Sequence, residues 1–384
     1  MLNDALSLVP RVGRADVLIF VEDPGAANYV AQLPSALRQK GWSTKLFAAG
    51  TARAHLLQRG VDCEQVQASC DAGRMLELES PEILVVGTSE NPDTLGLELI
   101  RAARSRGIPT VGAVDAESNA GYRFQGRSES PLGYAPDWLL VPDQRTKDSY
   151  TGLGFRADRI MVCGHPHYDE VREAARQLAT RDRSSLRQSM FPGAPPDSVV
   201  IVFVAEVSTG LNPGQYKRSA EYTLTGRGSS TGRTEIVLEE LLDAAHLIVP
   251  RPFLVLRLHP KNTLDEFRPY LEEVDQVSRD EHPLEIVYAA DLVVGMASML
   301  LFEAAIMGRP TLSIVPRALE AQWALGVCIG TTPCVTTRHE FRSTLCSLLR
   351  RDMDTFRPPP LDPVLFRSLE RTAGCIAQLL SAAR

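Results

Sequence analysis

The chain has 384 residues, of which 44% are hydrophobic and 23% are charged, and its formal net charge is -6. This composition is typical of a globular protein large enough for two domains, and it excludes the disordered and membrane-spanning classes. Because the chain is acidic and contains no run of lysines and arginines, general nucleic-acid binding is excluded as well.

The cysteines and the first residues predict a cytoplasmic protein. The seven cysteines form no CxxC pair and no metal-binding spacing, which is typical of reduced thiols. The first residues, MLNDALSLVPRVGR, lack a signal-peptide core, and no apolar run approaches the roughly 20 residues that span a bilayer. Peripheral contact with a membrane stays open.

The first half of the chain alternates buried strands with helices. The strands are expected at Asp16–Val21, Ser43–Ala48, Ile83–Val86, Thr110–Val114, Trp138–Val141 and Ile160–Cys163. Such alternation predicts a parallel sheet with crossover helices, so residues 1–164 are interpreted as a Rossmann-like domain. Residues 165–197 are interpreted as a linker and hinge.

The strand–helix pattern restarts in the second half. Strands are expected at Val199–Val204, Phe253–Leu258, Glu285–Val287 and in the two apolar runs of Asp291–Ile314. Residues 198–351 are therefore predicted to form a second Rossmann-like domain, and residues 352–384 a tail helix that packs back. The predicted fold class is α/β, with two Rossmann-like domains facing across a cleft.

The segment Asp291–Ile314, DLVVGMASMLLFEAAIMGRPTLSI, organises this second half. It reads as a strand, a tight turn, a buried helix that stops at Gly308, and a further strand. A helix that starts at the carboxyl end of a parallel strand presents backbone N–H groups to an anion. We therefore expect a phosphate site at the start of this helix, formed by Gly295, Ala297, Ser298 and Met299.

Three motifs carry a resemblance to known enzymes. They are CGHPHYDEV at 163–171, RLHPKN at 257–262, and the segment Asp291–Ile314. Together with the element order, they resemble GT-B bacterial glycosyltransferases of surface polysaccharide synthesis, of the polysialyltransferase and Kdo-transferase type, and CDP-glycerol glycerophosphotransferases. The non-hydrolysing UDP-N-acetylglucosamine 2-epimerases share the fold and a similar serine-then-glutamate helix start.

The resemblance implies that the second domain binds the nucleotide. His259, at the end of a strand, is expected to contact the donor phosphate, although a strand-end histidine can also simply bond to backbone. Glu303 is expected to bind the nucleotide ribose, and its structural alternative is a buried carboxylate paired with an arginine. Glu206 and Arg233 are further candidates for the nucleotide site.

The first domain is expected to bind the acceptor. Asp23, in the loop EDPGAAN after the first strand, is the candidate base, with Glu22 and Glu90 as competitors and a plain helix-entry residue as the alternative. The candidate acceptor contacts are Gly25, Asn28, Glu90, Asp115, Glu117, Asn119 and Arg123. The last four lie in one polar loop, where they could bind acceptor hydroxyls or donor phosphate. The alternative is that this loop is only exposed to solvent.

Two segments have a predicted conformational role. The polar insertion Val207–Gly232 is interpreted as a mobile lid, because long loops within compact domains are usually functional or disordered. In the segment GHPHYD, Gly164, Pro166 and Asp169 are interpreted as hinge residues. A metal site at His165 and His167 is not expected, since no third ligand has a suitable spacing.

The preferred function is transfer of a sugar from a nucleotide-activated donor to a hydroxyl acceptor, with no cofactor and no essential divalent metal. The main alternative is a nucleotide-sugar 2-epimerase or hydrolase. In the epimerases a glycine pair follows the serine and a TERPE-like segment follows later. Here Met299 and Leu300 replace the glycines, and only Arg317 with Glu320 is similar to that segment. A nucleotide-sugar-binding protein without catalysis is the third alternative.

Overall fold

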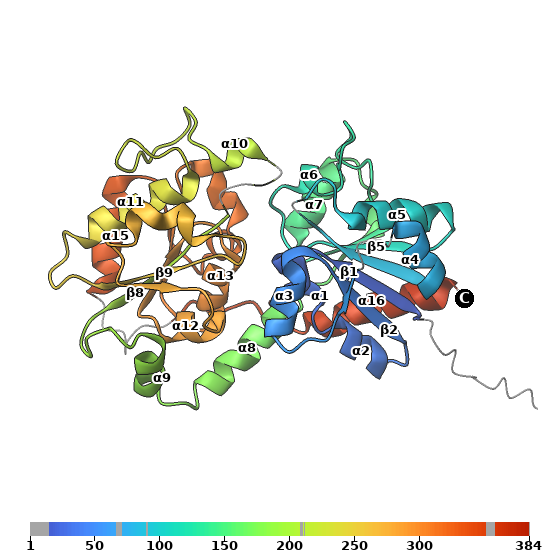
Figure 1. Ribbon diagram of the computed structural model, residues 1–384, viewed down its shortest axis with the longest axis horizontal. Coiled ribbons are helices and arrows are strands. Elements are labelled where there is room, and N and C mark those ends of the chain that lie inside the picture. Colours follow the sequence, from blue (N-terminus) through green and yellow to red (C-terminus); the bar gives the residue numbers. More distant parts are fainter. Residues whose placement is uncertain are drawn as a thin grey trace, which may run out of the picture. The chain divides into compact units, whose positions relative to one another are not determined.

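The computed structural model describes residues 15–66, 71–89, 91–207, 210, 212–350 and 358–383. They form two compact α/β units (Figure 1). The first takes the described residues up to Ala116, then Ala120–Gly164 and the segment from Leu369 onward, and the second takes Glu117–Asn119 and His165–Ser368. The main crossings between the units therefore fall after Gly164 and after Ser368.

The first unit is built on a seven-stranded parallel sheet of order β3-β2-β1-β4-β5-β6-β7. Its strands are β1 (Val17–Val21), β2 (Thr44–Ala48), β3 (Glu64–Gln65), β4 (Ile83–Gly87), β5 (Thr110–Ala113), β6 (Trp138–Val141) and β7 (Ile160–Val162). The central strand β1 pairs with β2 on one side and β4 on the other, so the strand order reverses between β1 and β4. All five residues of β1 are buried, as expected for a sheet covered on both faces.

Helices cover both faces of this sheet. Val17, Ile19 and Val21 pack under α1 (Pro24–Val30), α2 (Leu33–Gln39), α3 (Gly50–Gln58) and α16 (Ser368–Ala383). Leu18 and Phe20 point to the opposite face, which is covered by α4 (Ala72–Glu79), α5 (Leu95–Ser105), α6 (Ala120–Arg123) and α7 (Gln144–Gly152). The C-terminal helix α16 contributes Ala373, Ile376 and Leu380 to the first core, so the predicted packing of the tail helix is confirmed.

The second unit contains a six-stranded parallel sheet of order β10-β9-β8-β11-β12-β13. Its strands are β8 (Val200–Val204), β9 (Phe253–Arg257), β10 (Gln276–Ser278), β11 (Leu292–Gly295), β12 (Thr311–Ile314) and β13 (Cys334–Val335). The chain builds β8, β9 and β10 outward in one direction and then returns to add β11, β12 and β13 on the other side. The order therefore reverses between β8 and β11.

The second sheet is also covered on both faces. One face carries α11 (Arg233–Ala245), the 3-10 segment Leu264–Tyr270 and α15 (Arg338–Leu349). The other carries α8 (His167–Leu178), α9 (Arg183–Met190), α12 (Pro283–Ala289) and α13 (Met299–Ile306). The remaining short helices are α10 (Pro213–Tyr216) and α14 (Leu325–Cys328), and three further 3-10 segments lie at Ala157–Arg159, Ala318–Trp323 and Pro363–Leu365.

One predicted strand is wrong. Glu285–Val287 belongs to helix α12, whose start is fixed by Pro283 in the first turn and by the His282 side chain, which accepts from the Leu284 N–H. The apolar residues Leu284, Ile286 and Val287 face the core with a spacing that suits a short helix as well as a strand. The strand that follows β9 in the chain is β10 (Gln276–Ser278), which ends before α12 begins.

The insertion Val207–Gly232 is anchored in its described part. Lys217 forms an antiparallel bridge with Gly232, and the main-chain N–H groups of Gly226 and Arg227 donate to the carboxylates of Glu240 and Glu239 on α11. Thr223 donates from its main chain and side chain to the carbonyl of Pro316. The prediction of a mobile lid therefore does not describe residues 217–232, which are held against α11 and the loop after β12.

No helix in the described part of the chain is both long and apolar enough to cross a membrane.

Candidate functional site

The candidate site of the second unit lies where β8 and β11 end. Ligands of open parallel sheets bind at such a reversal of strand order, outside the carboxyl ends of the strands. Here Gly295 ends β11, and Ser298 caps helix α13 by accepting from the Leu300 N–H at 3.2 Å. A side chain on Gly295 would meet Val204 of β8 at 2.5 Å, so this close approach of the two strands requires glycine. Residues 297–300 are half-buried, which leaves the helix start partly open to solvent.

A carboxylate already lies at this helix start. Glu206, two residues after β8, accepts a hydrogen bond from the Ala297 N–H through Oε1 at 2.5 Å. Its Oε2 accepts from Arg233 Nη1 at 2.6 Å. Both of these residues were predicted to contact the nucleotide, and the structure brings Glu206, Arg233 and Ala297 together. The Ala297 N–H thus faces an anionic oxygen, as a phosphate-binding backbone group does.

Behind Glu206 lies a row of alternating charges. Arg233, which begins α11, is 1% exposed and also donates to Glu320, whose second oxygen accepts from Arg317 Nε at 2.7 Å. Burial lowers the pKa of the Arg233 guanidinium, but the neighbouring Glu206 and Glu320 raise it by more, so its pKa lies above the usual range. Its Nη2 is buried and makes no hydrogen bond to any described residue. Arg317 and Glu320 therefore position Arg233 and, through it, Glu206.

His259 follows β9 at the same edge of the sheet. Its main-chain N–H donates to Asn262 Oδ1 at 3.0 Å, and its ring Nδ1 accepts from the Lys261 N–H at 3.1 Å. Because Nδ1 accepts, the neutral ring carries its proton on Nε2, which makes that nitrogen a donor. The backbone contact that was considered as the alternative role is present, and it holds the ring in the tautomer that can donate to a phosphate. Asn262 also donates to the Glu206 carbonyl at 3.3 Å, which links the loops after β8 and β9.

Glu303 lies on α13 and is buried, with 4% of its surface exposed. Its partner is not an arginine: Oε1 lies 3.1 Å from Nε2 of His167, whose Nδ1 lies 3.1 Å from Glu170 Oε2. Simultaneous donation to both carboxylates requires the imidazolium form of His167. The HPHYD segment thus supplies a side chain to the helix that was predicted to hold the ribose. Within the same segment Gly164 adopts the left-handed φ of +80°, and Asp169 accepts from the Arg367 N–H at 2.6 Å.

In the first unit, a second cluster of polar side chains lies at the carboxyl ends of β1, β4 and β5. Asp115, after β5, accepts from the Thr88 hydroxyl at 2.7 Å and lies 3.9 Å from Arg123 Nη1. Its Oδ2 is so close to Gly25 that a Cβ there would meet it at 2.2 Å. Asp23, at the start of α1, is 8% exposed and its side chain makes no capping hydrogen bond. The structure therefore brings Asp115 together with Gly25 and Arg123 beside the loop that carries Asp23.

The other predicted acceptor residues differ in their contacts and in the unit to which they belong. Asn28 Oδ1 accepts from Arg59 at 2.5 Å and lies 2.7 Å from His55 Nε2, so its oxygen ties α1 to α3. Glu117 and Asn119 are half-buried and belong to the short segment that is grouped with the second unit. Glu22 Oε1 accepts from Asn91 at 2.9 Å, and Glu90 lies outside the described residues.

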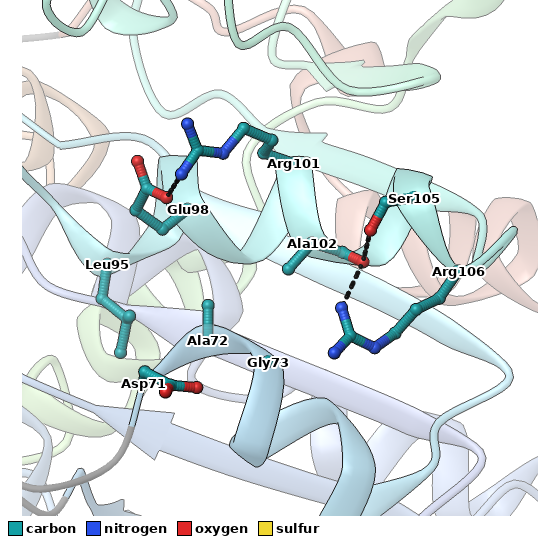
Figure 2. A pocket seen from close by; sticks show the side chains of 9 residues that line it. All are labelled: Asp71, Ala72, Gly73, Leu95, Glu98, Arg101, Ala102, Ser105 and Arg106. Atoms are coloured by element: carbon teal, nitrogen blue, oxygen red, sulfur yellow. Dashed lines mark hydrogen bonds and ion pairs between the residues drawn. The ribbon is translucent and has the colours of Figure 1, made fainter.

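A cavity with a volume of about 510 Å³ lies elsewhere, between α4 and α5 (Figure 2). Figure 2 shows Arg101 paired with Glu98, and Arg106 donating to the Ala102 carbonyl, so these guanidinium groups are already used. None of the predicted site residues lines the cavity. In the described chain, no group of three or more histidine, cysteine or acidic side chains is arranged to hold a metal ion.

Sequence reasoning missed three contributors to these clusters. His167 and Glu320 are charged or titratable residues next to recognised motifs, and Thr88 directly follows a recognised strand. A usable signal existed for Thr88 and Glu320, because each follows a strand at the edge where ligands bind. For His167 the signal was only its place in the hinge motif, which gave no indication of a contact 136 residues further along the chain.

Comparisons with known proteins find structural similarity without sequence similarity. No protein-family model and no curated protein sequence matches the chain. The UDP-GlcNAc 2-epimerase from Neisseria meningitidis, solved with UDP-GlcNAc, is 14% identical with a TM-score of 0.66, over 94% of this chain and 99% of that one. The Methanocaldococcus jannaschii epimerase, solved with UDP-GlcNAc and UDP, is 13% identical with a TM-score of 0.64, over 94% and 99%. Anabaena HepE, solved with UDP-glucose, is 12% identical with a TM-score of 0.58, over 95% and 98%.

These similarities confirm the predicted fold class of two Rossmann-like α/β domains of the GT-B type, and the distant likeness to the epimerases. At such identities the similarity concerns the fold, and fold alone does not decide the reaction.

Proposed function

We propose that this chain binds a nucleotide-activated sugar at the start of α13 and transfers the sugar to a hydroxyl acceptor. The observation that carries this proposal is the hydrogen bond from the Ala297 N–H to a carboxylate oxygen of Glu206. A backbone donor at a helix start, at the reversal point of a parallel sheet, already faces one anionic group, the Glu206 carboxylate. A ligand phosphate is the natural replacement for that carboxylate.

The residues at this edge have complementary roles in the proposal. The helix start and His259 Nε2 donate to the donor diphosphate, and both stabilise the negative charge that develops on the departing phosphate. Glu303, held by His167, accepts a hydrogen bond from a ribose hydroxyl. These donors and dipoles need no reorganisation during the reaction, because they are already fixed by Asn262, Lys261 and His167. The proposal includes no divalent metal.

The first unit supplies the acceptor site in this proposal. Asp23 removes the proton from the acceptor hydroxyl, as a carboxylate general base does. Arg123 and Thr88 fix Asp115, which then accepts from a second acceptor hydroxyl. The choice of Asp23 over Glu22 is supported by the hydrogen bond between Glu22 and Asn91, which already uses one carboxylate oxygen of Glu22.

A nucleotide-sugar 2-epimerase is the second candidate, and the solved structures with the same fold favour it. Two of them carry the epimerase description and were solved with UDP-GlcNAc, one of them also with UDP. Met299 and Leu300 argue against it, since they stand where the epimerases have glycines after the serine and give the helix start a bulkier surface. We therefore place transfer first.

Product analysis separates the candidates. The full-length protein is incubated with UDP-GlcNAc and UDP-glucose, with and without pooled saccharide acceptors, and products are followed by anion-exchange chromatography and NMR. Release of UDP only when acceptor is present supports transfer, and a sugar altered at C2 without acceptor supports epimerisation. Binding of UDP without any turnover supports a binding protein, and absence of UDP binding contradicts the whole proposal.

A further inference from the structure

Two cysteines that are far apart in the chain meet in the first unit. Cys163 directly follows β7, and Cys375 lies on the C-terminal helix α16. Their sulfur atoms are 3.5 Å apart, and the Cys163 thiol donates a hydrogen bond to Cys375 Sγ. Cys163 is 1% exposed, whereas Cys375 is half-buried, so Cys375 is the more accessible residue of the two.

The pair is chemically asymmetric. The hydrogen bond from Cys163, together with the nearby Arg371 guanidinium, lowers the pKa of Cys375 to about 7 against the effect of burial. Donation of that hydrogen bond and burial both raise the pKa of Cys163. Arg371 is held in place, because its Nε donates to the Cys163 carbonyl at 3.0 Å. At neutral pH the thiolate therefore forms on Cys375, the more accessible of the two residues. The thiolate is the reactive form of cysteine.

The other described cysteines lack this arrangement. Burial raises the pKa of Cys63 and of Cys334, which makes their thiolates scarcer at neutral pH. Cys328 is exposed, and its thiol donates to the carbonyls of Ala321 and Gln322. Reactivity should therefore be selective for Cys375.

We propose that Cys163 and Cys375 form a reversible disulfide, with Cys375 as the attacking sulfur and a low-molecular-weight disulfide such as oxidised glutathione as the oxidant. The Cys375 thiolate attacks one sulfur of oxidised glutathione, forms a mixed disulfide and releases one glutathione thiolate. Cys163 then loses its proton to solvent and attacks Cys375 Sγ, which releases the second glutathione thiolate. Two protein thiols are oxidised and one glutathione disulfide is reduced to two thiols.

Formation of the disulfide requires only a small movement of the two sulfur atoms. A disulfide has an S–S length of about 2.05 Å, so the sulfurs must approach by roughly 1.5 Å from their present separation. The bond would join the end of β7 to α16 and close a loop across 212 positions of the chain. That loop contains both crossings between the units, after Gly164 and after Ser368. The disulfide would thus fasten α16 to the sheet it covers, next to the point where the chain leaves the first unit.

The proposal is independent of the proposed function, and the full-length protein tests it. The reduced protein is incubated with oxidised glutathione at pH 7.5, and non-reducing digests are analysed by mass spectrometry. Wild type should give the Cys163–Cys375 cross-linked peptide, two hydrogen masses lighter than its reduced parts. Cys163→Ser should stop at a glutathione adduct on Cys375, because the second attack is removed. Cys328→Ser, which changes an exposed cysteine, should behave as wild type.

Two physical readouts accompany the mapping. A cross-link over so long a loop restricts the unfolded chain, so oxidised wild type should melt about 3–8 °C higher than reduced wild type, and dithiothreitol should reverse the shift. The alkylation rate of Cys375 should rise with pH about a midpoint near 7. A glutathione adduct that persists on Cys375 in wild type, a cross-link to any other cysteine, or no oxidation of Cys375 would each overturn the proposal. Because these readouts use wild type, they hold even if a variant fails to fold.

Discussion

Glu206 and Ala297 are joined by a 2.5 Å hydrogen bond that links the loops after β8 and β11, the two strands between which the second sheet reverses its order. The side chain of Glu206 is 15% exposed, so its charge is partly shielded from solvent. A negative charge at this place opposes the arrival of a phosphate, because like charges in a partly dry site repel. Glu206 therefore acts as an internal competitor for the anion that the site is proposed to bind.

Replacement of this competitor should strengthen nucleotide binding. Glu206→Gln keeps the shape of the side chain and an oxygen for Ala297 but removes the charge, so affinity for UDP should rise roughly tenfold, which corresponds to about 1.4 kcal/mol. Isothermal titration calorimetry measures the change. Glu240→Gln is the matched control, since Glu240 on α11 is likewise paired with an arginine, Arg338. Weaker binding by Glu206→Gln would instead make Glu206 a direct contact of the ligand.

His259→Ala should weaken UDP binding by roughly tenfold, because a hydrogen bond to a charged group contributes about 1.5–3 kcal/mol. The thermal midpoint reports separately whether the substitution disturbs the fold, because the ring also accepts the Lys261 N–H. The control is His246→Ala at the exposed C-terminal end of α11. Equal affinity in His259→Ala and wild type would remove His259 from the proposed phosphate contacts.

Glu303→Gln tests the ribose contact separately from the fold. The amide retains an oxygen for His167, so the protein should stay folded, whereas Glu303→Ala would leave His167 buried without that partner. The proposed role requires that Glu303→Gln lowers the affinity for UDP and leaves the affinity for inorganic diphosphate unchanged, because diphosphate has no ribose. An equal loss for both ligands would show that the substitution disturbs the whole helix start rather than a ribose contact.

Asp23→Asn should slow turnover by roughly 100-fold or more, the usual scale for loss of a general base, and leave UDP affinity intact. Steady-state kinetics with the acceptor found in the product screen, together with calorimetry, separates the two effects. Glu22→Gln serves as the matched control from the neighbouring position. Full activity in Asp23→Asn would leave the base unassigned and would return Glu22 to consideration.

Gly25 and Asp115 provide a stability test that does not depend on any ligand. A methyl group on Gly25 would lie 2.2 Å from Asp115 Oδ2, so Gly25→Ala should destabilise the protein by about 1–3 kcal/mol in urea unfolding. The double variant with Asp115→Ala should lose most of that penalty, because the clashing carboxylate is gone. Additive losses would mean that Gly25→Ala acts through the backbone of α1 and not through Asp115.

The sequence predicted the site where local patterns determine the structure. Ser298 caps the helix with its side chain and Gly308 adopts the left-handed φ of +73°, so the cap and the helix stop in Asp291–Ile314 could be recognised without a structure. The strand predicted at Glu285–Val287 was wrong, since a short apolar run suits either element and the deciding features were Pro283 and the His282 cap.

The contacts between distant residues could not be predicted. Glu303 meets a histidine 136 positions away, and Ala297 meets a carboxylate 91 positions away. Neither partner is distinguished by its local sequence, because many histidines and glutamates lie after strands or in first helical turns. Ala297 and Glu206 are brought together by the strand order of the second sheet, which places the ends of β8 and β11 side by side, and Glu303 and His167 by the packing of α8 and α13 in one core. The arginine that was the alternative partner for Glu303 followed from charge rules alone, which lack that information.

The C-terminal helix α16 covers β1 through Ala373, Ile376 and Leu380, although the rest of the first unit lies before Gly164. During synthesis, the ribosome therefore makes the first sheet long before the helix that shields one of its faces. The intervening polypeptide, His165–Ser368, can fold around its own sheet while the part of that face that packs against α16 stays exposed. Nascent chains that stall before Leu369 would carry an apolar surface open to chaperones and proteases, which gives the cell a simple way to recognise incomplete copies.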